Sequence, residues 1–359
     1  MRIDVHLHVL GRGTDLNEVE REVYFNAEDN QHWFTRLLYN MIEDDLKGMG
    51  ADFNRDGKLS TEEYLELIYR IVTSSEEIDA VVLLALDALF SPETGELDRR
   101  RTDLWVPNRF LAEKVKELNQ RLQGEADPQK RGKRFLFGAS VSPNRKDWEE
   151  ELEYVLKGTD AVLIKWIPSV QHISVKDDRH RAFYRALAAE GMPLLCHVGP
   201  EYSFPEGIRH RELDDFRFLV KPLSEGVKVI AAHCAAPVFP PFEENEIKEF
   251  YALMKDANGA GEVRLWADTS ALSLATRIPL IPQIIKTFPP EWLLHGSDFP
   301  IPINGWPHLP WITSKMTPQD YLRIYHTKNP LDKDVRIKRA HGFSEAILEN
   351  AQKVLRLPS

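Results

Sequence analysis

The chain has 359 residues, of which 43% are hydrophobic, and its eight Trp and seventeen Phe supply ample material for a packed core, which excludes global disorder. A formal net charge of −10 argues against nucleic acid as the main partner, because phosphate binding needs a concentrated basic face. There is no apolar stretch of the roughly 20 residues that a membrane helix needs, no signal-peptide pattern, and only two cysteines. We therefore expect a cytoplasmic protein that acts on a small molecule, without nucleic acid or membrane partners and with homo-oligomerisation left open.

The first predicted strand, residues 2–9, alternates polar and apolar residues. Successive side chains of a strand point to opposite faces, so we expect Asp4, His6 and His8 on one face and the intervening apolar residues on the other. Neutral imidazole is a good ligand for zinc and its first-row neighbours. The two histidines therefore predict a metal site that other parts of the chain complete.

An inserted segment, residues 15–77, separates this strand from the next one. Hydrophobic residues at helical spacing predict two amphipathic helices within residues 31–72. The loop between them, residues 52–63, matches the calcium-binding EF-hand pattern D-x-[DN]-x-[DN]-G-x5-E at every position. The predicted calcium ligands are the side chains of Asp52, Asn54, Asp56 and Glu63 and the main-chain carbonyl of Lys58. The alternative is an acidic helix-loop-helix that binds no metal.

Seven further strands follow, separated by helical patterns. The strands are predicted at residues 80–86, 134–141, 161–167, 193–198, 227–233, 263–268 and 292–298, and helices at 148–157, 181–190, 211–223, 244–255 and 343–355, the last closing the barrel wall. Strands that alternate with helices pair in parallel, and eight of them close a barrel. We therefore predict an α/β fold: a single (β/α)8 TIM barrel over residues 1–359, with the EF-hand-like helix-loop-helix inserted after the first strand. The alternative, an open doubly wound sheet, normally carries a glycine-rich phosphate loop where this chain has its histidines.

Polar residues stand at the ends of several of these apolar strands, and in a closed barrel such residues converge at one mouth. They are His6, His8, Lys165, His197, His233, Asp268 and Asp298. A single buried histidine is more often a satisfied core residue, but four of them with carboxylates would leave several buried polar groups that a metal ion can satisfy. Cys196 and Cys234 are expected to be buried free thiols that face away from the neighbouring histidines.

Five stretches together carry a resemblance to a known family. They are Asp4-Val-His6-Leu-His8, Cys196-His197-Val-Gly199, His233-Cys-Ala-Ala, Gly296-Ser-Asp298-Phe-Pro and Asn350-Ala-Gln-Lys-Val-Leu. On these motifs the chain resembles the amidohydrolase superfamily, in its amidohydrolase-2 (amidohydrolase-related) branch, over nearly its whole length outside the insertion. The resemblance implies a divalent metal, zinc first and manganese second, bound by His6, His8, His197 and Asp298, with His233 beside it.

The predicted activity is metal-dependent hydrolysis of a small amide, lactone or ester by a metal-activated water. Asp298 is the predicted base, which takes the proton of that water and delivers it to the leaving group. His233 either stabilises the developing oxyanion or supports the site. Lys165 is either carboxylated so that it bridges two metals, as in other branches of the superfamily, or an unmodified partner of a substrate carboxylate. Asp268 is expected to orient a ligand histidine.

Two other functions stay open at this point. A metal-dependent non-oxidative decarboxylase (a lyase) of a small carboxylic acid would use the same ligands, and the resembling branch contains such enzymes. A calcium-responsive binding protein on an inactive barrel would explain the EF-hand pattern but not the complete set of metal ligands. Arg12, Arg209 and His210 are expected on loops above the mouth, as substrate anchors or as surface charges.

Overall fold

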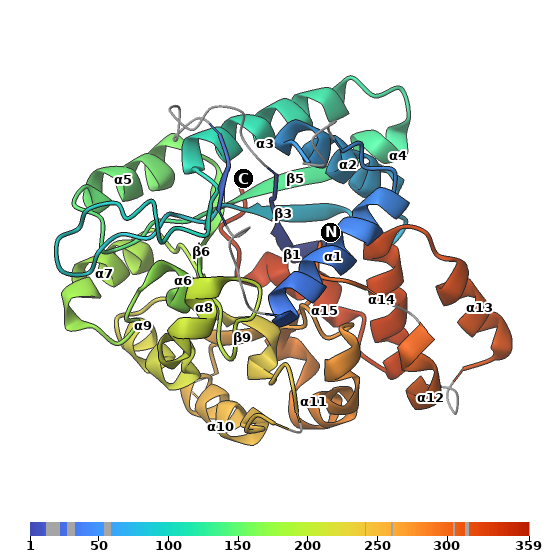
Figure 1. The fold of residues 1–359 in the computed structure, drawn as a ribbon. Helices are drawn as coiled ribbons and strands as arrows, with labels where there is room; N and C mark the ends of the chain where they lie inside the picture. The colour runs from blue at the N-terminus through green and yellow to red at the C-terminus, as the bar shows by residue number, and fades with distance from the viewer. Residues whose placement is uncertain are drawn as a thin grey trace.

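The computed structural model describes residues 1–11, 22–26, 33–53, 59–240, 242–259, 261–303, 306–312 and 316–358. Eight strands are hydrogen-bonded in the order β1-β3-β5-β6-β7-β8-β9-β10, with helices arranged around them (Figure 1). These strands are β1 (Ile3–His8), β3 (Ala80–Leu84), β5 (Arg134–Ala139), β6 (Ala161–Trp166), β7 (Leu194–Cys196), β8 (Val229–Ala231), β9 (Leu265–Asp268) and β10 (Leu293–Leu294). All eight predicted strands are present, each inside its predicted range.

Strand β1 and the segment that begins with β10 meet and close the sheet into a barrel. The N–H of Val5 donates to the carbonyl of His295 at 3.0 Å, and the N–H of Asp298 donates to the carbonyl of His6 at 2.8 Å. Leu7 pairs in parallel with Phe299. The predicted TIM barrel is therefore confirmed.

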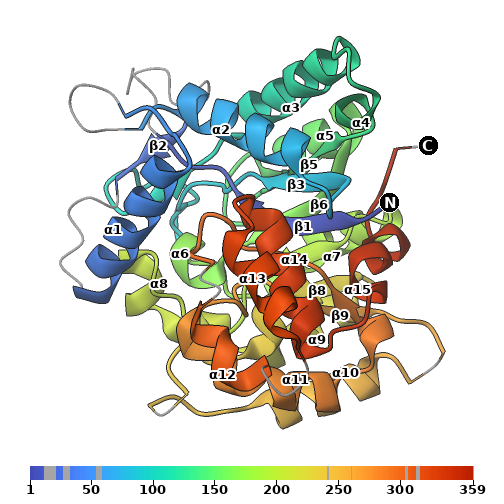
Figure 2. The same ribbon diagram turned by 90° about the vertical axis from the view of Figure 1, so that its right-hand side faces the viewer.

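The α-helices surround this barrel (Figure 2). They are α1 (Trp33–Gly48), α2 (Thr61–Ser74), α3 (Asn108–Gln123), α4 (Pro128–Arg131), α5 (Trp148–Gly158), α6 (Pro168–Gln171), α7 (Arg181–Ala189), α8 (Pro205–Arg209), α9 (Val220–Ser224), α10 (Ile247–Ala257), α11 (Ile281–Thr287), α12 (Leu309–Ile312), α13 (Pro318–His326), α14 (Pro330–His341) and α15 (Ala346–Glu349). Helices α5, α7 and α10 match predicted helices closely. None of the helices in the described ranges is long and apolar enough to cross a membrane.

The prediction of one helix over residues 211–223 is wrong. The chain forms two 3-10 turns, Arg211–Asp214 and Phe216–Leu219, before α9. Asp215 separates them, because its backbone is extended and its side chain accepts the N–H of Arg217, which starts a new helical turn.

The barrel interior is filled by an apolar cluster with members on the strands, among them Ile3, Leu163 and Ile230. The predicted helix over residues 343–355 is instead the short α15 followed by a 3-10 turn, Asn350–Lys353. The apolar residues of this segment, Ala351, Val354 and Leu355, pack against the interior cluster. The N–H of Arg356 donates to the carbonyl of Val162 near the start of β6 at 3.1 Å, so the segment covers the N-terminal end of the barrel.

The inserted segment also contributes a strand that sequence analysis did not predict. Strand β2 (Tyr24–Phe25) pairs in antiparallel fashion with β4 (Leu104–Trp105), which follows β3 in the chain. Helix α1 packs on the loop after β7: Thr35 donates to the carbonyl of Tyr202, and the Tyr39 hydroxyl donates to the carbonyl of Ser203 at 2.5 Å. The insertion is thus placed at the C-terminal face of the barrel, next to α8 (Figure 2).

Helices α1 and α2 flank the EF-hand-like loop. Three predicted calcium ligands, Asn54, Asp56 and Lys58, lie outside the described residues. The Glu63 side chain accepts the N–H of Ser60 at 3.3 Å in a capping box at the start of α2. Calcium binding therefore stays a prediction from the sequence pattern.

Candidate metal centre

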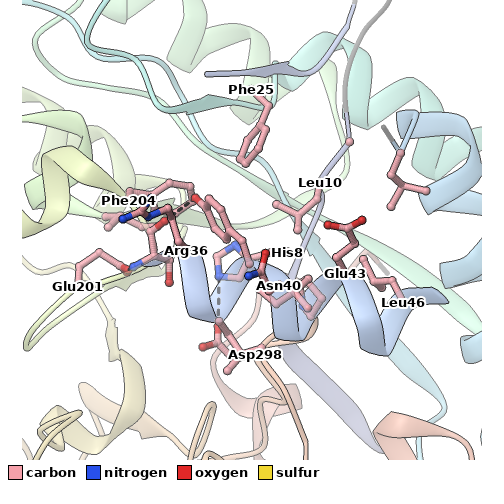
Figure 3. Close-up of a pocket in the computed structure, with 18 of the residues that line it drawn as sticks. His8, Leu10, Phe25, Arg36, Asn40, Glu43, Leu46, Glu201, Phe204 and Asp298 are labelled. Carbon is pink, nitrogen blue, oxygen red and sulfur yellow. Dashed lines mark hydrogen bonds and ion pairs between the residues drawn. The ribbon is translucent and has the colours of Figure 1, made fainter. Parts of the chain in front are cut away.

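Three predicted ligands converge at the mouth of the barrel. The Nε2 atoms of His6 and His8 are 3.2 Å apart. The Oδ1 atom of Asp298 lies 3.3 Å from the first nitrogen and 3.2 Å from the second. Figure 3 shows the contact between His8 and Asp298 at the base of a pocket. Two imidazoles and a carboxylate that face one point form a donor set that can hold a metal ion.

The alternation predicted for β1 is wrong in part, because a bulge interrupts it. The pairing of β1 with β3 shifts register between Asp4 and Leu7. As a result Val5 belongs to the barrel interior, whereas Leu7 packs in the layer between strands and helices. His6 still points into the mouth, where its Nε2 lies 3.0 Å from the Lys165 Nζ.

Asp4 does not join His6 at the mouth. Its Oδ1 accepts the backbone N–H of His6 at 3.1 Å and that of Ser297 at 2.9 Å. Ser297 directly precedes Asp298 in the chain. The Asp4 carboxylate therefore ties together the two backbone segments that carry the converging ligands, across the seam where the barrel closes.

Asp268, at the end of β9, is a buried centre of hydrogen bonds. Its Oδ2 accepts from His6 Nδ1 at 2.8 Å, which leaves the lone pair of His6 Nε2 for a metal. Its Oδ1 accepts the backbone N–H of His233 at 2.9 Å and that of Ser270 at 3.0 Å. These contacts supply the geometry that the predicted orienting role requires.

His197 and His233 lie beside the three converging ligands, and His197 Nδ1 is 3.2 Å from His233 Nε2. His197 Nε2 contacts the carbonyl of Gly199 at 3.2 Å, and His233 Nδ1 contacts the carbonyl of Ser270 at 3.1 Å. Each contact requires a hydrogen on that nitrogen, so the two nitrogens that face each other both carry lone pairs. Such a pair needs a proton or a cation nearby.

Burial of these histidines disfavours the proton and so favours the cation. It lowers the pKa of His197 and of His233 well below the usual value, and it does the same for His6. His6, His197 and His233 are therefore neutral, which is the form that binds metal. Burial opposes the ionisation of Asp298, but the neighbouring His6 and His8 outweigh it and keep its pKa below the usual value. The residues present thus fit a divalent cation.

Lys165 is fully buried on β6, and burial lowers its pKa. Its Nζ lies 3.0 Å from His6 Nε2, next to the donor set. His233 and Asp298 both adopt the left-handed backbone region, with φ of 58° and 66°. Non-glycine residues in this region are uncommon and concentrate at functional sites.

A pocket of about 400 Å³ opens above this donor set (Figure 3). Its floor includes His8, His197, His233 and Asp298. Its opposite wall is the inserted helix α1, which contributes Arg36, Tyr39, Asn40, Ile42, Glu43 and Leu46. The insertion therefore shapes the space in which a substrate would meet the floor.

Sequence analysis did not identify two buried groups near this site. Glu201 lines the pocket, and its Oε2 lies 3.7 Å from His197 Nδ1. Arg277 is buried and donates to the carbonyls of Ala236 and Pro237. Neither residue ends a strand, and the only sequence signal for Glu201 is its position in the loop four residues after His197.

Of the three residues expected on loops above the mouth, two lie in the described part of the chain and neither lines the pocket. Arg12 lies outside the described residues. Arg209 and His210 contact Glu206 and not the pocket. Cys196 and Cys234 are buried and free, as predicted.

A family model described as amidohydrolase matches residues 3–342. The chain belongs to the amidohydrolase-2 family. The predicted family is therefore confirmed over nearly the whole chain. This is a family of metal-dependent enzymes that act on small molecules, which agrees with the donor set at the mouth.

Comparison with curated protein sequences finds no significant match. Among solved structures, an uncharacterised TIM-barrel protein from Bordetella bronchiseptica aligns with a TM-score of 0.52 and 16% identity, covering 98% of this chain and 99% of that one. A probable 2-pyrone-4,6-dicarboxylic acid hydrolase from Acinetobacter baumannii, with citric acid bound, aligns with a TM-score of 0.51 and 14% identity, covering 98% of each chain. At these identities the likeness supports the fold.

Proposed function

We propose that this amidohydrolase-2 member is a metal-dependent hydrolase of a small amide, lactone or ester. One observation carries the proposal: the donor atoms of His6, His8 and Asp298 lie within 3.3 Å of one another at the floor of a pocket. His197 is the proposed fourth ligand, since its Nδ1 lone pair lies on the same floor. Zinc is the proposed metal, and manganese is the alternative.

A divalent ion held by these residues supplies Lewis acidity, which lowers the pKa of water and polarises a substrate carbonyl. The Asp298 carboxylate is the proposed group that accepts a proton from the attacking water and returns it to the leaving group. His233 presents its Nε2 beside His197 and is proposed either to stabilise the developing negative charge or to support the site. Asp268 holds His6 in orientation through Nδ1.

The proposal is tested with protein reconstituted separately with zinc and with manganese. The substrate panel contains simple lactones, amides and esters, and a pyrone dicarboxylate, after the name of the Acinetobacter neighbour. Hydrolysis that depends on added metal and disappears in Asp298→Ala is the expected result. Release of carbon dioxide from aromatic acids without hydrolysis of any panel member would make the protein a decarboxylase instead.

We also propose, on the sequence pattern, that residues 52–63 bind calcium. The pattern lies between two helices, α1 and α2, as in an EF-hand, and because α1 forms one wall of the pocket, calcium there would act next to the pocket. Calcium titration of the zinc-loaded protein, followed by both turnover and thermal unfolding, tests this. A rise in Tm or a change in KM is expected, and no response in either would contradict calcium binding.

A further inference from the structure

A second group of metal-ligand side chains lies outside the pocket, and we call it the rim cluster: Arg101, His172, Glu206 and His210. Its residues come from the three connections that follow β3, β6 and β7, and Glu206 lies in the short helix α8 of the last one. One donor atom each from His172, Glu206 and His210 lies within 4.8 Å of the other two. None of these residues lines the pocket above the first donor set.

The three donor atoms surround a single cationic nitrogen. Arg101 Nη2 lies 2.8 Å from Glu206 Oε2, 3.1 Å from His172 Nε2 and 3.2 Å from His210 Nε2. The guanidinium thus occupies the point toward which two imidazoles and a carboxylate converge, so the rim cluster is built around a positive charge.

When that charge is a guanidinium, the two close neighbours of His172 Nε2 place opposite demands on this nitrogen. His172 Nε2 is 2.7 Å from Glu206 Oε2, which can only accept a hydrogen bond, and 3.1 Å from Arg101 Nη2, which can only donate one. A neutral imidazole nitrogen carries either a hydrogen or a lone pair, so it satisfies one of these neighbours and not both. A metal ion in place of Nη2 removes these opposite demands, because the nitrogen and the carboxylate then both bind through lone pairs.

The remaining contacts favour such an ion. Glu212 Oε1 lies 3.4 Å from His210 Nδ1, on the side of the ring away from the rim cluster, so His210 Nε2 is the ring nitrogen that faces the other donors. Glu206 keeps a partner when Arg101 leaves, because its Oε1 pairs with Arg209 at 2.5 Å. The Arg101 side chain is 37% exposed and can turn into solvent, whereas that of Glu206 is 1% exposed.

We propose that the rim cluster is a second metal site, in which His172, Glu206 and His210 bind a divalent transition metal ion such as zinc when Arg101 turns outward. Two nitrogen donors and one oxygen donor suit zinc and its neighbours rather than calcium or magnesium, which prefer oxygen ligands alone. The site is independent of the hydrolase proposal.

Zinc uptake of four proteins tests the site, measured by equilibrium dialysis with elemental analysis and by calorimetric titration. The wild type should bind one zinc more than His210→Ala. Arg101→Ala removes the competing cation and should bind that zinc roughly tenfold more tightly, the scale of one charge-assisted hydrogen bond. Arg100→Ala removes a neighbouring exposed arginine outside the rim cluster and should behave as wild type. Circular dichroism establishes that each variant is folded.

Equal uptake by wild type and His210→Ala, or unchanged affinity in Arg101→Ala, would overturn the proposal. A fifth protein, His6→Ala, tests the first donor set separately. It should lose the zinc at the pocket floor and keep the zinc at the rim cluster. Failure at the pocket floor and failure at the rim cluster are therefore distinguishable.

Discussion

The two ends of the barrel differ in the chemistry of the side chains that fill them: polar at the C-terminal end and apolar at the N-terminal end. The C-terminal end carries His6, His8 and Asp298 under an open pocket, and several of its polar groups face one another at short distances. The N-terminal end is closed by Val354 and Leu355 of the last segment, packed against the interior cluster. Under the proposed function, the strands support catalysis at one end and stability at the other, so changes at the two ends should separate these properties.

The largest expected effect is on activity at the open end. His6→Ala and Asp298→Ala should each reduce kcat/KM by roughly a thousandfold or more, because each removes a donor atom to the metal. Thermal unfolding of the metal-free variants should stay close to that of metal-free wild type. His326→Ala, an exposed histidine of α13, is the matched control and should keep full activity. Substantial turnover in either ligand variant contradicts the proposed site.

The closed end should give the opposite result. Leu355 is 7% exposed, and Leu355→Ala should lower the free energy of unfolding by about 2–3 kcal/mol, because it removes buried apolar atoms and leaves a cavity. Chemical denaturation measures this loss. The kcat of the folded variant should match that of wild type, and a clear decrease in kcat would show that the two ends are coupled.

An intermediate effect, on metal affinity, is expected from Asp268, which contacts the proposed ligand His6. Asp268→Asn keeps the shape of the side chain but weakens its contact with His6 Nδ1, so metal affinity should fall by roughly 10- to 100-fold. Competition with a chelator measures the affinity. Excess metal should restore most of the activity, a rescue that His6→Ala should not show. If Asp268→Asn binds metal as tightly as wild type, the orienting role is wrong.

The smallest effect is expected at the wall that the insertion supplies. Tyr39→Phe removes the hydrogen bond that holds α1 to the carbonyl of Ser203. The free energy that keeps α1 in place should fall by about 0.5–1.5 kcal/mol. KM should rise by up to about tenfold while kcat stays within about twofold, since α1 supplies a wall of the pocket and none of the proposed metal ligands. A fall in kcat at unchanged KM would argue against a wall that acts in substrate binding.

Much of this arrangement was predictable, because it depends on local patterns. The strands are short apolar runs, and His6, His8, His197 and Asp298 are identifiable because they stand at or just beyond strand ends. The bulge in β1 was not predictable. It depends on the pairing with β3 and on the contact between Asp4 and Ser297, which are far apart in the sequence.

The rim cluster was not predictable from the sequence either, because it also depends on contacts between distant residues. Its members lie on three connections between strands, and only the fold brings Arg101 between His172 and His210. Arg209 and His210 were expected on loops above the mouth, but nothing in the sequence indicates that both contact Glu206. The short β2 pairs with residues beyond β3, so it too depends on a distant partner.

The seam of the barrel has a consequence for how the protein matures. His6 and His8 lie on β1, the first strand of the barrel, whereas Asp298 follows β10, the eighth. The hydrogen bond from the N–H of Ser297 to the Asp4 carboxylate also joins these two parts of the chain. Under the proposed function, the ligand set is therefore complete only when the segment after β10 has joined β1, so full metal coordination requires a closed barrel.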